Sequence, residues 1–178
     1  MDASTIPAPR IRRLNTPSDS EVEQLADVLV DCVEGGASVS FMLPIAREHA
    51  LAFWRRVGAE TARDERALLV AEIEGRIVGT VHLVLALPEN QPHRADLSKL
   101  LVHRAARRRG VAEALMRAAD DLARDCGRRT LVLDTASDTA ARLYGRLGWI
   151  ECGTVPDFAL LPDGRPCATT FFYRHLPT

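Results

Sequence analysis

Apolar positions in the first sixty residues follow the period of a helix after one short strand. The run Ile11 to Leu14 is expected to form that strand. A helix should follow, with a cap at Ser18 or Ser20 and an end at Gly35-Gly36, because apolar residues recur between them every three or four positions. A second helix should begin near Pro44, since proline is favoured in a first helical turn. Its apolar positions are Ala50, Leu51, Phe53, Trp54 and Val57.

The middle of the chain changes to the patterns of β-strands. Two β-rich runs, Ala67 to Ile73 and Ile77 to Leu87, flank the turn sequence Glu74-Gly75-Arg76 and predict a hairpin. A polar loop from Pro88 to His93 precedes a further strand from Ala95 to Val102. These runs predict a sheet that is antiparallel at its start.

The last third of the chain alternates strands with helices. The expected elements are a helix from Gly110 to Cys126, a strand from Thr130 to Thr135, a helix from Thr139 to Leu147 capped by Ser137 or Asp138, and two strands, Ile150 to Leu161 and Thr169 to His175, around the turn Pro162-Asp163-Gly164. The whole order predicts one α/β (α+β) domain. Its mixed, twisted sheet should have about six to seven strands and about four flanking helices.

Length and composition agree with a single domain. The 178 residues, 47% apolar and 26% charged, suit one globular core. We expect residues 11–178 to form it and residues 1–10, which include Pro7 and Pro9, to form a flexible tail. A net charge of −1 argues against a nucleic-acid binder, and no apolar run is long enough to cross a membrane.

Cysteine and histidine spacing indicates a cytoplasmic protein without a metal site. The first residues do not have the pattern of a signal peptide. The four cysteines, Cys32, Cys126, Cys152 and Cys167, show no C-x-x-C spacing and are expected to be reduced thiols. The five histidines are equally dispersed, which argues against zinc. A monomer and a homodimer both stay open.

The strongest candidate site is a basic turn between a strand and a helix, from Leu101 to Ala112. Four arginines lie in it: Arg104, Arg107, Arg108 and Arg109. The first amides of a helix have no partner within it and carry the positive end of its dipole. Because Gly110 and Ala112 leave that backbone bare, the turn predicts a site for pyrophosphate or a similar anion. Motifs of ATPases and dinucleotide folds are absent, and a solvated arginine surface is the alternative.

The same turn carries a family resemblance. Arg107-x-x-Gly110-x-Ala112 resembles the R/Q-x-x-G-x-G/A signature of the GNAT superfamily of CoA-dependent N-acetyltransferases. The resemblance implies an enzyme with acetyl-CoA as cosubstrate and no metal, whose pyrophosphate lies on the turn and whose pantetheine arm lies along the preceding strand. The residues expected to bind acetyl-CoA are Leu100, Leu101, Val102, Arg107, Arg108, Arg109, Gly110, Val111, Ala112 and Tyr144.

A more detailed resemblance, from about Ile11 to His175, is to the tabtoxin-resistance acetyltransferases. It rests on Gly35-Gly36-Ala37-Ser38-Val39-x-Phe41-Met42, Arg94-Ala95-Asp96, Leu133-Asp134-Thr135 and Pro162-Asp163-Gly164-Arg165. Asp96 stands where those proteins have a glutamate. The resemblance implies a small-molecule amine as acceptor, such as an amino-acid-like toxin or antibiotic, and a role in resistance.

Three residues are candidates for proton transfer. Asp96 and Asp134 lie in β-like segments, where an aspartate is either paired or raised in pKa by desolvation. The resemblance places both where the amine proton is accepted, although a structural role stays open. It also places Tyr144 opposite the CoA sulfur, with a packed core tyrosine as the alternative. With a reference pKa of about 10, against about 8.5 for a thiol, Tyr144 is expected to pass its proton to the thiolate.

The acceptor is expected where three loops converge: Gly35 to Met42, Gln91 to Arg94 and Asp157 to Arg165. Its candidate contacts are Ser38, Phe41, Arg94 and Asp157.

Two other functions stay open. A non-catalytic acyl-CoA sensor or regulatory module would keep the turn but not the polar residues opposite the thioester. A nucleic-acid binder using Arg104 to Arg109 is disfavoured by the balanced charge and the lack of neighbouring aromatic residues.

Overall fold

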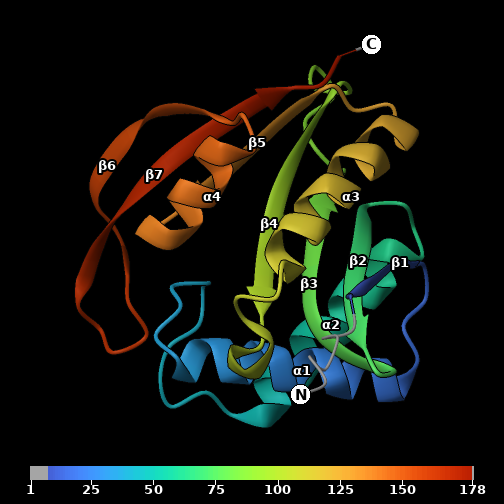
Figure 1. The fold of residues 1–178 in the computed structure, drawn as a ribbon, viewed down its shortest axis with the longest axis vertical. Coiled ribbons are helices and arrows are strands. Elements are labelled where there is room, and N and C mark those ends of the chain that lie inside the picture. The colour runs from blue at the N-terminus through green and yellow to red at the C-terminus, as the bar shows by residue number, and fades with distance from the viewer. Residues whose placement is uncertain (1–7, 178) are drawn as a thin grey trace, which may run out of the picture.

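Seven strands form one mixed sheet in the computed structural model, which describes residues 8–177 (Figure 1). The strands are β1 (Arg10–Leu14), β2 (Arg66–Ile73), β3 (Arg76–Val84), β4 (Arg94–Val102), β5 (Thr130–Thr135), β6 (Ile150–Leu160) and β7 (Pro166–His175). The helices are α1 (Asp19–Glu34), α2 (Arg47–Thr61), α3 (Val111–Asp125) and α4 (Asp138–Arg146), with a short 3₁₀ helix η1 (Arg104–Ala106). The predicted fold class, with its single mixed sheet and four helices, is confirmed.

Helices cover the two faces of the sheet separately. Alternate residues of β2 enter two different cores, since successive side chains of a strand point to opposite faces. Leu69 packs with Leu115 of α3, whereas Leu68 packs with Leu25 of α1 and Trp54 of α2. Figure 1 shows α3 and α4 over the face that is turned toward the viewer. The sequence thus produces a three-layer arrangement, with α1 and α2 on the opposite face.

The ends of α1 follow the predicted local rules. Ser18 caps the helix: its hydroxyl accepts a hydrogen bond from the amide of Glu21 at 3.3 Å, and Glu21 accepts one from the Ser18 amide at 2.7 Å. This reciprocal box satisfies two amides that the helix leaves free. Gly35 caps the other end, and Gly36 follows with a φ of 87° that favours glycine. Of the two expected caps, Ser18 is the one used.

Strand β4 leaves the regular sheet halfway along its length. It pairs in parallel with β5 only from Arg94 to Asp96, and the two strands then diverge (Figure 1). Its pairing with β3 slips between Ser98 and Leu101, where Lys99 has a φ of 54°. This extra residue changes the phase of the strand, so Leu97 enters the α3 core while Leu101 enters the α1–α2 core. The result is an opening in the sheet beside the second half of β4.

Three boundaries differ from the sequence prediction by three residues each. Helix α2 begins at Arg47 and not near Pro44, because the preceding segment is held by the β6–β7 hairpin: the Leu43 amide donates to the Pro162 carbonyl at 2.9 Å. Strand β3 ends at Val84 and not at Leu87, since the amides of Leu85 and Ala86 turn to the Glu65 carbonyl. Strand β7 begins earlier, at Pro166, and lies between β5 and β6.

The expected N-terminal tail lies largely outside the described residues. Positions 1–7 belong to that part, and β1 already begins at Arg10, which pairs with Glu72 of β2. Within residues 8–177, no helix combines the length and the apolar character needed to cross a membrane.

Gly79 on β3 has no side chain, which allows α3 to pack close to the sheet. A larger residue at this position should therefore destabilise the protein. A Cβ at Gly79 would lie 3.0 Å from the Leu101 carbonyl oxygen and 3.0 Å from Val111 at the start of α3. We expect Gly79→Ala to lower the free energy of unfolding by about 1–3 kcal/mol, since overpacking forces backbone and side chains to shift.

Chemical denaturation measures this effect, with Gly145→Ala as the control. A Cβ at Gly145 within α4 meets no atom within 4 Å, so that variant should be about 0.5–1 kcal/mol more stable. Equal stability of the two variants would contradict the close packing at Gly79.

Candidate functional site

The turn between β4 and α3 presents a row of free backbone amides. Gly110 is the N-cap of α3 with a φ of 74°, and Arg108 before it has a φ of 60°. Within the described chain, the amides from Arg108 to Ala112 have no hydrogen-bond acceptor; the first helical bond is that of the Ala114 amide to the Gly110 carbonyl at 3.0 Å. Such amides at a helix N-terminus are a site for an anion.

The surroundings of these amides are open. A Cβ added at Gly110 would meet no atom within 4 Å, so space beside the backbone is left for a ligand. Arg108 is exposed and makes no ion pair within residues 8–177, and the buried Nε of Arg109 has no partner there. Arg107 turns back, with its Nε 3.3 Å from the Val102 carbonyl oxygen. The predicted anion site therefore keeps free donors on both backbone and side chains.

The sequence analysis counted Arg104 among the arginines of the anion site, but Arg104 is already bonded to Asp31 of α1. Its backbone amide and its Nε donate to the Asp31 carboxylate at 2.7 and 2.9 Å. Burial opposes the charge of Asp31, but these bonds and the nearby His103 together lower its pKa. Arg104 thus anchors η1 to α1 and fixes where the turn begins.

A cleft of about 390 Å³ lies where β4 and β5 diverge. Its walls come from β3, β4, β5 and β7: Val84, Arg94, Asp96, Leu97, Ser98, Val132, Leu133, Asp134 and Phe171. Asp96 and Asp134 are both in it, as the sequence predicted for two residues of one site. The cleft opens on the part of the sheet that α1 and α2 leave uncovered.

The two aspartates of the cleft have different surroundings. Asp96 forms an ion pair with Arg94, whose Nε also donates to Gln91 at 2.7 Å. Asp134 keeps contact with solvent but has no such partner among the described residues. Partial desolvation raises the pKa of Asp134, the positive charge of Lys99 lowers it, and the charge of Asp96 raises it, with a net rise. The raised pKa makes Asp134 a better proton acceptor than an ordinary aspartate.

Tyr144 is buried in the core that α3 and α4 form with the sheet, with 5% of its surface exposed. Its ring contacts Phe172 and Trp149, with centroids 5.7 and 6.0 Å away. Burial raises the pKa of Tyr144 well above its usual value, and the charge of Asp134 adds to this.

The sequence analysis expected Tyr144 to transfer its proton fully to the CoA thiolate, but the difference in pKa between the two groups opposes this transfer. A group of higher pKa is the weaker acid, so a phenol does not protonate a thiolate favourably. Tyr144 can instead donate a strong hydrogen bond to an anion, because it keeps its proton.

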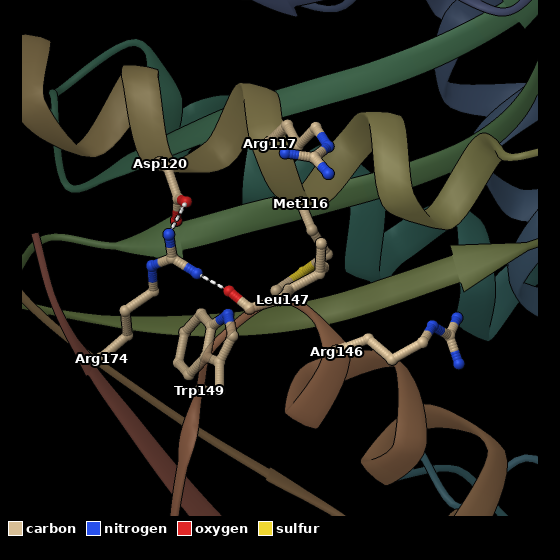
Figure 2. Close-up of a pocket in the computed structure, with 7 residues that line it drawn as sticks. All are labelled: Met116, Arg117, Asp120, Arg146, Leu147, Trp149 and Arg174. Atoms are coloured by element: carbon tan, nitrogen blue, oxygen red, sulfur yellow. Dashed lines mark hydrogen bonds and ion pairs between the residues drawn. The ribbon is translucent and has the colours of Figure 1, made fainter.

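Helix α4 is fixed to α3 by one arginine, as Figure 2 shows. Arg174 of β7 pairs with Asp120 of α3 at 3.1 Å and donates to the carbonyl of Leu147 at the end of α4. These groups line a small cavity of about 100 Å³ that also includes Trp149. The contacts of Arg174 join α3 to the end of α4 and thereby set the position of Tyr144, one turn before Leu147.

Two of the three loops expected around the acceptor come together. The Ser38 hydroxyl donates to the Leu160 carbonyl at 3.0 Å, which joins the α1–α2 loop to the β6–β7 hairpin that carries Asp157. The Gln91 to Arg94 loop does not converge with them. It lies at the other end of β4, where the His93 carbonyl accepts from the Arg129 amide at 2.8 Å, and only the Arg94 side chain reaches the cleft.

Phe41, one of the predicted acceptor contacts, lies in the core between the sheet and helices α1 and α2. It is 7% exposed and packs edge-on against Phe53, with ring centroids 5.3 Å apart. Its position indicates that it holds the α1–α2 loop in place. Asp157 is exposed in a bulge of β6, with a φ of 50°.

Lys99 follows the cleft residue Ser98 on β4, and the sequence analysis did not consider it. Its Nζ donates to the Ser40 hydroxyl at 3.2 Å and lies 5.8 Å from the centroid of Phe53. The available signal was that Lys99 is the single lysine among 23 basic residues. Within residues 8–177, no three His, Cys, Asp or Glu side chains form a group that could hold a metal ion.

Comparisons with known proteins agree with this geometry. A family model described as "Acetyltransferase (GNAT) family" matches residues 29–149. The chain is 32% identical over 126 residues to the "Uncharacterized N-acetyltransferase in hisH-hisA intergenic region" of Azospirillum brasilense, an alignment that covers 70% of this chain and 73% of that protein.

Solved structures share the fold over nearly the whole chain. Salmonella typhimurium yncA, whose structure holds its cofactor acetyl-CoA, has a TM-score of 0.77 at 19% identity and covers 97% of this chain and 96% of its own. The ribosomal-protein-alanine N-acetyltransferase from Brucella melitensis has a TM-score of 0.76 at 26% identity, with 94% and 99% covered.

Proposed function

The chain belongs to the acetyltransferase (GNAT) family, a family of enzymes that use acetyl-CoA, and we propose that it transfers the acetyl group directly to the amine of a small molecule. The observation that carries this proposal is the row of free amides from Arg108 to Ala112, beside the opening between β4 and β5. Bound acetyl-CoA supplies a thioester whose carbonyl carbon is open to attack by an amine. The residues of this chain bind the cofactor, accept the proton of the amine and stabilise the charges that develop during the reaction.

The turn and β4 fit the two polar parts of acetyl-CoA. The free amides, with Arg107, Arg108 and Arg109, offer donors for a pyrophosphate. Among the described residues, β4 has no strand partner on its β5 side after Asp96, so the backbone groups of Leu100, Leu101 and Val102 on that side can pair with the amides of a pantetheine arm. Val111 and Ala112 complete the binding surface at the start of α3. The same β4 amides can stabilise the oxyanion formed on attack.

Asp134 is proposed as the base that accepts the proton of the amine, directly or through water. Its raised pKa makes it a better proton acceptor than an ordinary aspartate, and it faces the cleft without an ion-pair partner in the described chain. Asp96 is already paired with Arg94, so we assign it to orienting the acceptor and to raising the pKa of Asp134.

Tyr144 is proposed to hydrogen-bond the departing sulfur. It carries a proton at all physiological pH values because its pKa is raised. A hydrogen bond to a developing thiolate stabilises charge without full transfer of the proton. The proton that Asp134 takes from the amine is released to solvent, and the thiolate gains a proton from solvent, so that the net products are the amide and the CoA thiol.

The finer identity of the acceptor rests on resemblance. The motifs shared with the tabtoxin-resistance acetyltransferases support an amino-acid-like toxin or antibiotic as acceptor, and a role in resistance. Ser38, Arg94 and Asp157 are proposed contacts near it. The four cysteines are all free, which supports a reducing, cytoplasmic setting.

The role of the turn predicts a selective loss of cofactor binding. We expect Gly110→Val to weaken acetyl-CoA binding about 10-fold or more, because the side chain would occupy the open space beside the free amides. Isothermal titration with acetyl-CoA measures this. Gly127→Val is the matched control, since Gly127 has a similar φ of 70° and equally open surroundings at the other end of α3. Equal affinities of the two variants would remove the turn from the proposal.

The role of Asp134 predicts both a rate and a pH effect. Asp134→Asn should lower kcat/KM about 100-fold or more while acetyl-CoA affinity is kept. In the unmodified protein Asp134 must be ionised to act, and its pKa is raised. The rate should therefore fall, on acidification, at a higher pH than the value of about 3.9 for a free aspartate. A larger loss in Asp96→Asn than in Asp134→Asn would reverse the assignment.

The role of Tyr144 predicts a loss of turnover alone. Tyr144→Phe keeps the ring contacts with Phe172 and Trp149 and removes the hydroxyl. We expect kcat to fall about 100-fold, while binding of acetyl-CoA and the melting temperature change little. Steady-state kinetics, titration and thermal unfolding separate these effects. Unchanged turnover would exclude the hydroxyl from the reaction.

A further inference from the structure

Most side chains next to Asp134 on the open face of the sheet are apolar. Phe171 lies directly opposite Asp134 in the antiparallel pair of β5 and β7, and Val132 lies two residues earlier on the same face of β5. Asp96 and Val84 continue the row of Val132 across β4 and β3. All five residues line the cleft of about 390 Å³. A molecule bound at the Asp134 carboxylate therefore lies against a valine and a phenyl ring.

The polar side chains of the cleft leave few groups free for an acceptor. Among residues 8–177, Arg94 is the one cation that lines the cleft, and it is paired with Asp96. Ser98 adds one hydroxyl, and Asp134 adds a carboxylate. The cleft thus offers an acidic anchor for an ammonium group and an apolar wall for the group that the ammonium carries.

A bulge in β6 adds a second phenyl ring to this wall. The pairing of β6 with β7 shifts between Val155 and Ala159, and Asp157 within this bulge has a φ of 50°. Bulges redirect side chains, and here the ring of Phe158 packs edge-on against Phe171, with centroids 5.3 Å apart and 86° between the planes. Phe158 is nevertheless 51% exposed. It therefore extends the apolar wall of the cleft with surface that a ligand can cover.

We propose that Phe171 and Phe158 bind an aromatic or branched apolar group of the acceptor, while the amine of the acceptor lies at Asp134. This inference rests on the proposed function and adds the group that the acceptor carries beside its amine. Burial of an apolar group against these rings favours binding, whereas a polar group in the same place would lose its hydrogen bonds with water. Polyamines and aminoglycosides are disfavoured for this reason.

Two amines of similar size and shape test this inference. Isopentylamine ends in two methyl groups, and β-alaninamide has a carboxamide in their place. Phenethylamine replaces the methyl groups with a ring. At saturating acetyl-CoA, we expect kcat/KM to be about 10-fold to 100-fold higher for isopentylamine than for β-alaninamide, and at least as high for phenethylamine.

Variants of the wall assign the preference to its residues. Phe158→Ser should raise KM for the two apolar amines about 3-fold to 10-fold, and leave β-alaninamide and the affinity for acetyl-CoA unchanged. Phe171→Ser should have a larger effect of the same kind, because Phe171 lines the cleft itself. Ile150→Ser is the matched control, since Ile150 is also 51% exposed and lies at the other end of β6. This control should change neither the preference nor the turnover.

Binding is measured apart from turnover by isothermal titration of the amines into the protein loaded with CoA. Phenethylamine should bind more tightly than β-alaninamide, and Phe158→Ser should reduce the difference. Sedimentation of the unmodified protein and of Phe158→Ser shows whether the exposed ring lies in a contact between two copies. We expect the same oligomeric state for both.

Three results would overturn the inference. They are equal or better turnover of β-alaninamide, an equal effect of Phe158→Ser on all three amines, and a dimer that Phe158→Ser dissociates. The last result would assign the exposed ring to a contact between copies. Each would leave the proposed acetyl transfer intact, whereas absence of acetyl-CoA binding, or of turnover with any amine, would remove both proposals.

Discussion

The divergence of β4 from β5 after Asp96 is the constraint on which the rest of the structure depends. A parallel pair of strands normally continues its hydrogen bonds, and here only three residues of each strand pair. The divergence leaves one edge of β4 free and opens the cleft that contains Asp134. The bulge at Lys99 belongs to the same distortion, because it turns Leu101 into the α1–α2 core.

Anchors on both sides keep this opening in place. On one side, Asp31 of α1 holds Arg104, so that the turn before α3 begins at a fixed position. On the other side, Arg174 joins α3 to the end of α4 and thereby positions Tyr144. The hairpin of β6 and β7 binds the α1–α2 loop through Ser38 and the Leu43 amide. The cleft therefore lies between elements that are each held in position by contacts outside the cleft.

Local features of the fold were predictable from the sequence, and long-range ones were not. The cap at Ser18 and the start of α3 at Gly110 depend on residues within one helical turn, so spacing alone indicates them. The start of α2 depends on a contact between Leu43 and Pro162, far away in the chain. The same limit applies to the site. The free amides of the turn follow from local pattern, whereas the pairing of Arg104 with Asp31 and the hydrogen bond of Lys99 to Ser40 arise only from tertiary structure.

The charges of the cleft also connect the two proton-handling residues of the proposed mechanism. The negative charge of Asp134 is one of the two causes that raise the pKa of Tyr144. When Asp134 accepts the proton of the amine, that charge disappears, and the pKa of Tyr144 must fall toward the value set by burial alone. The phenol then becomes a stronger hydrogen-bond donor at the stage when negative charge develops on the sulfur. The coupling follows from the proximity of the two residues and from the burial of Tyr144.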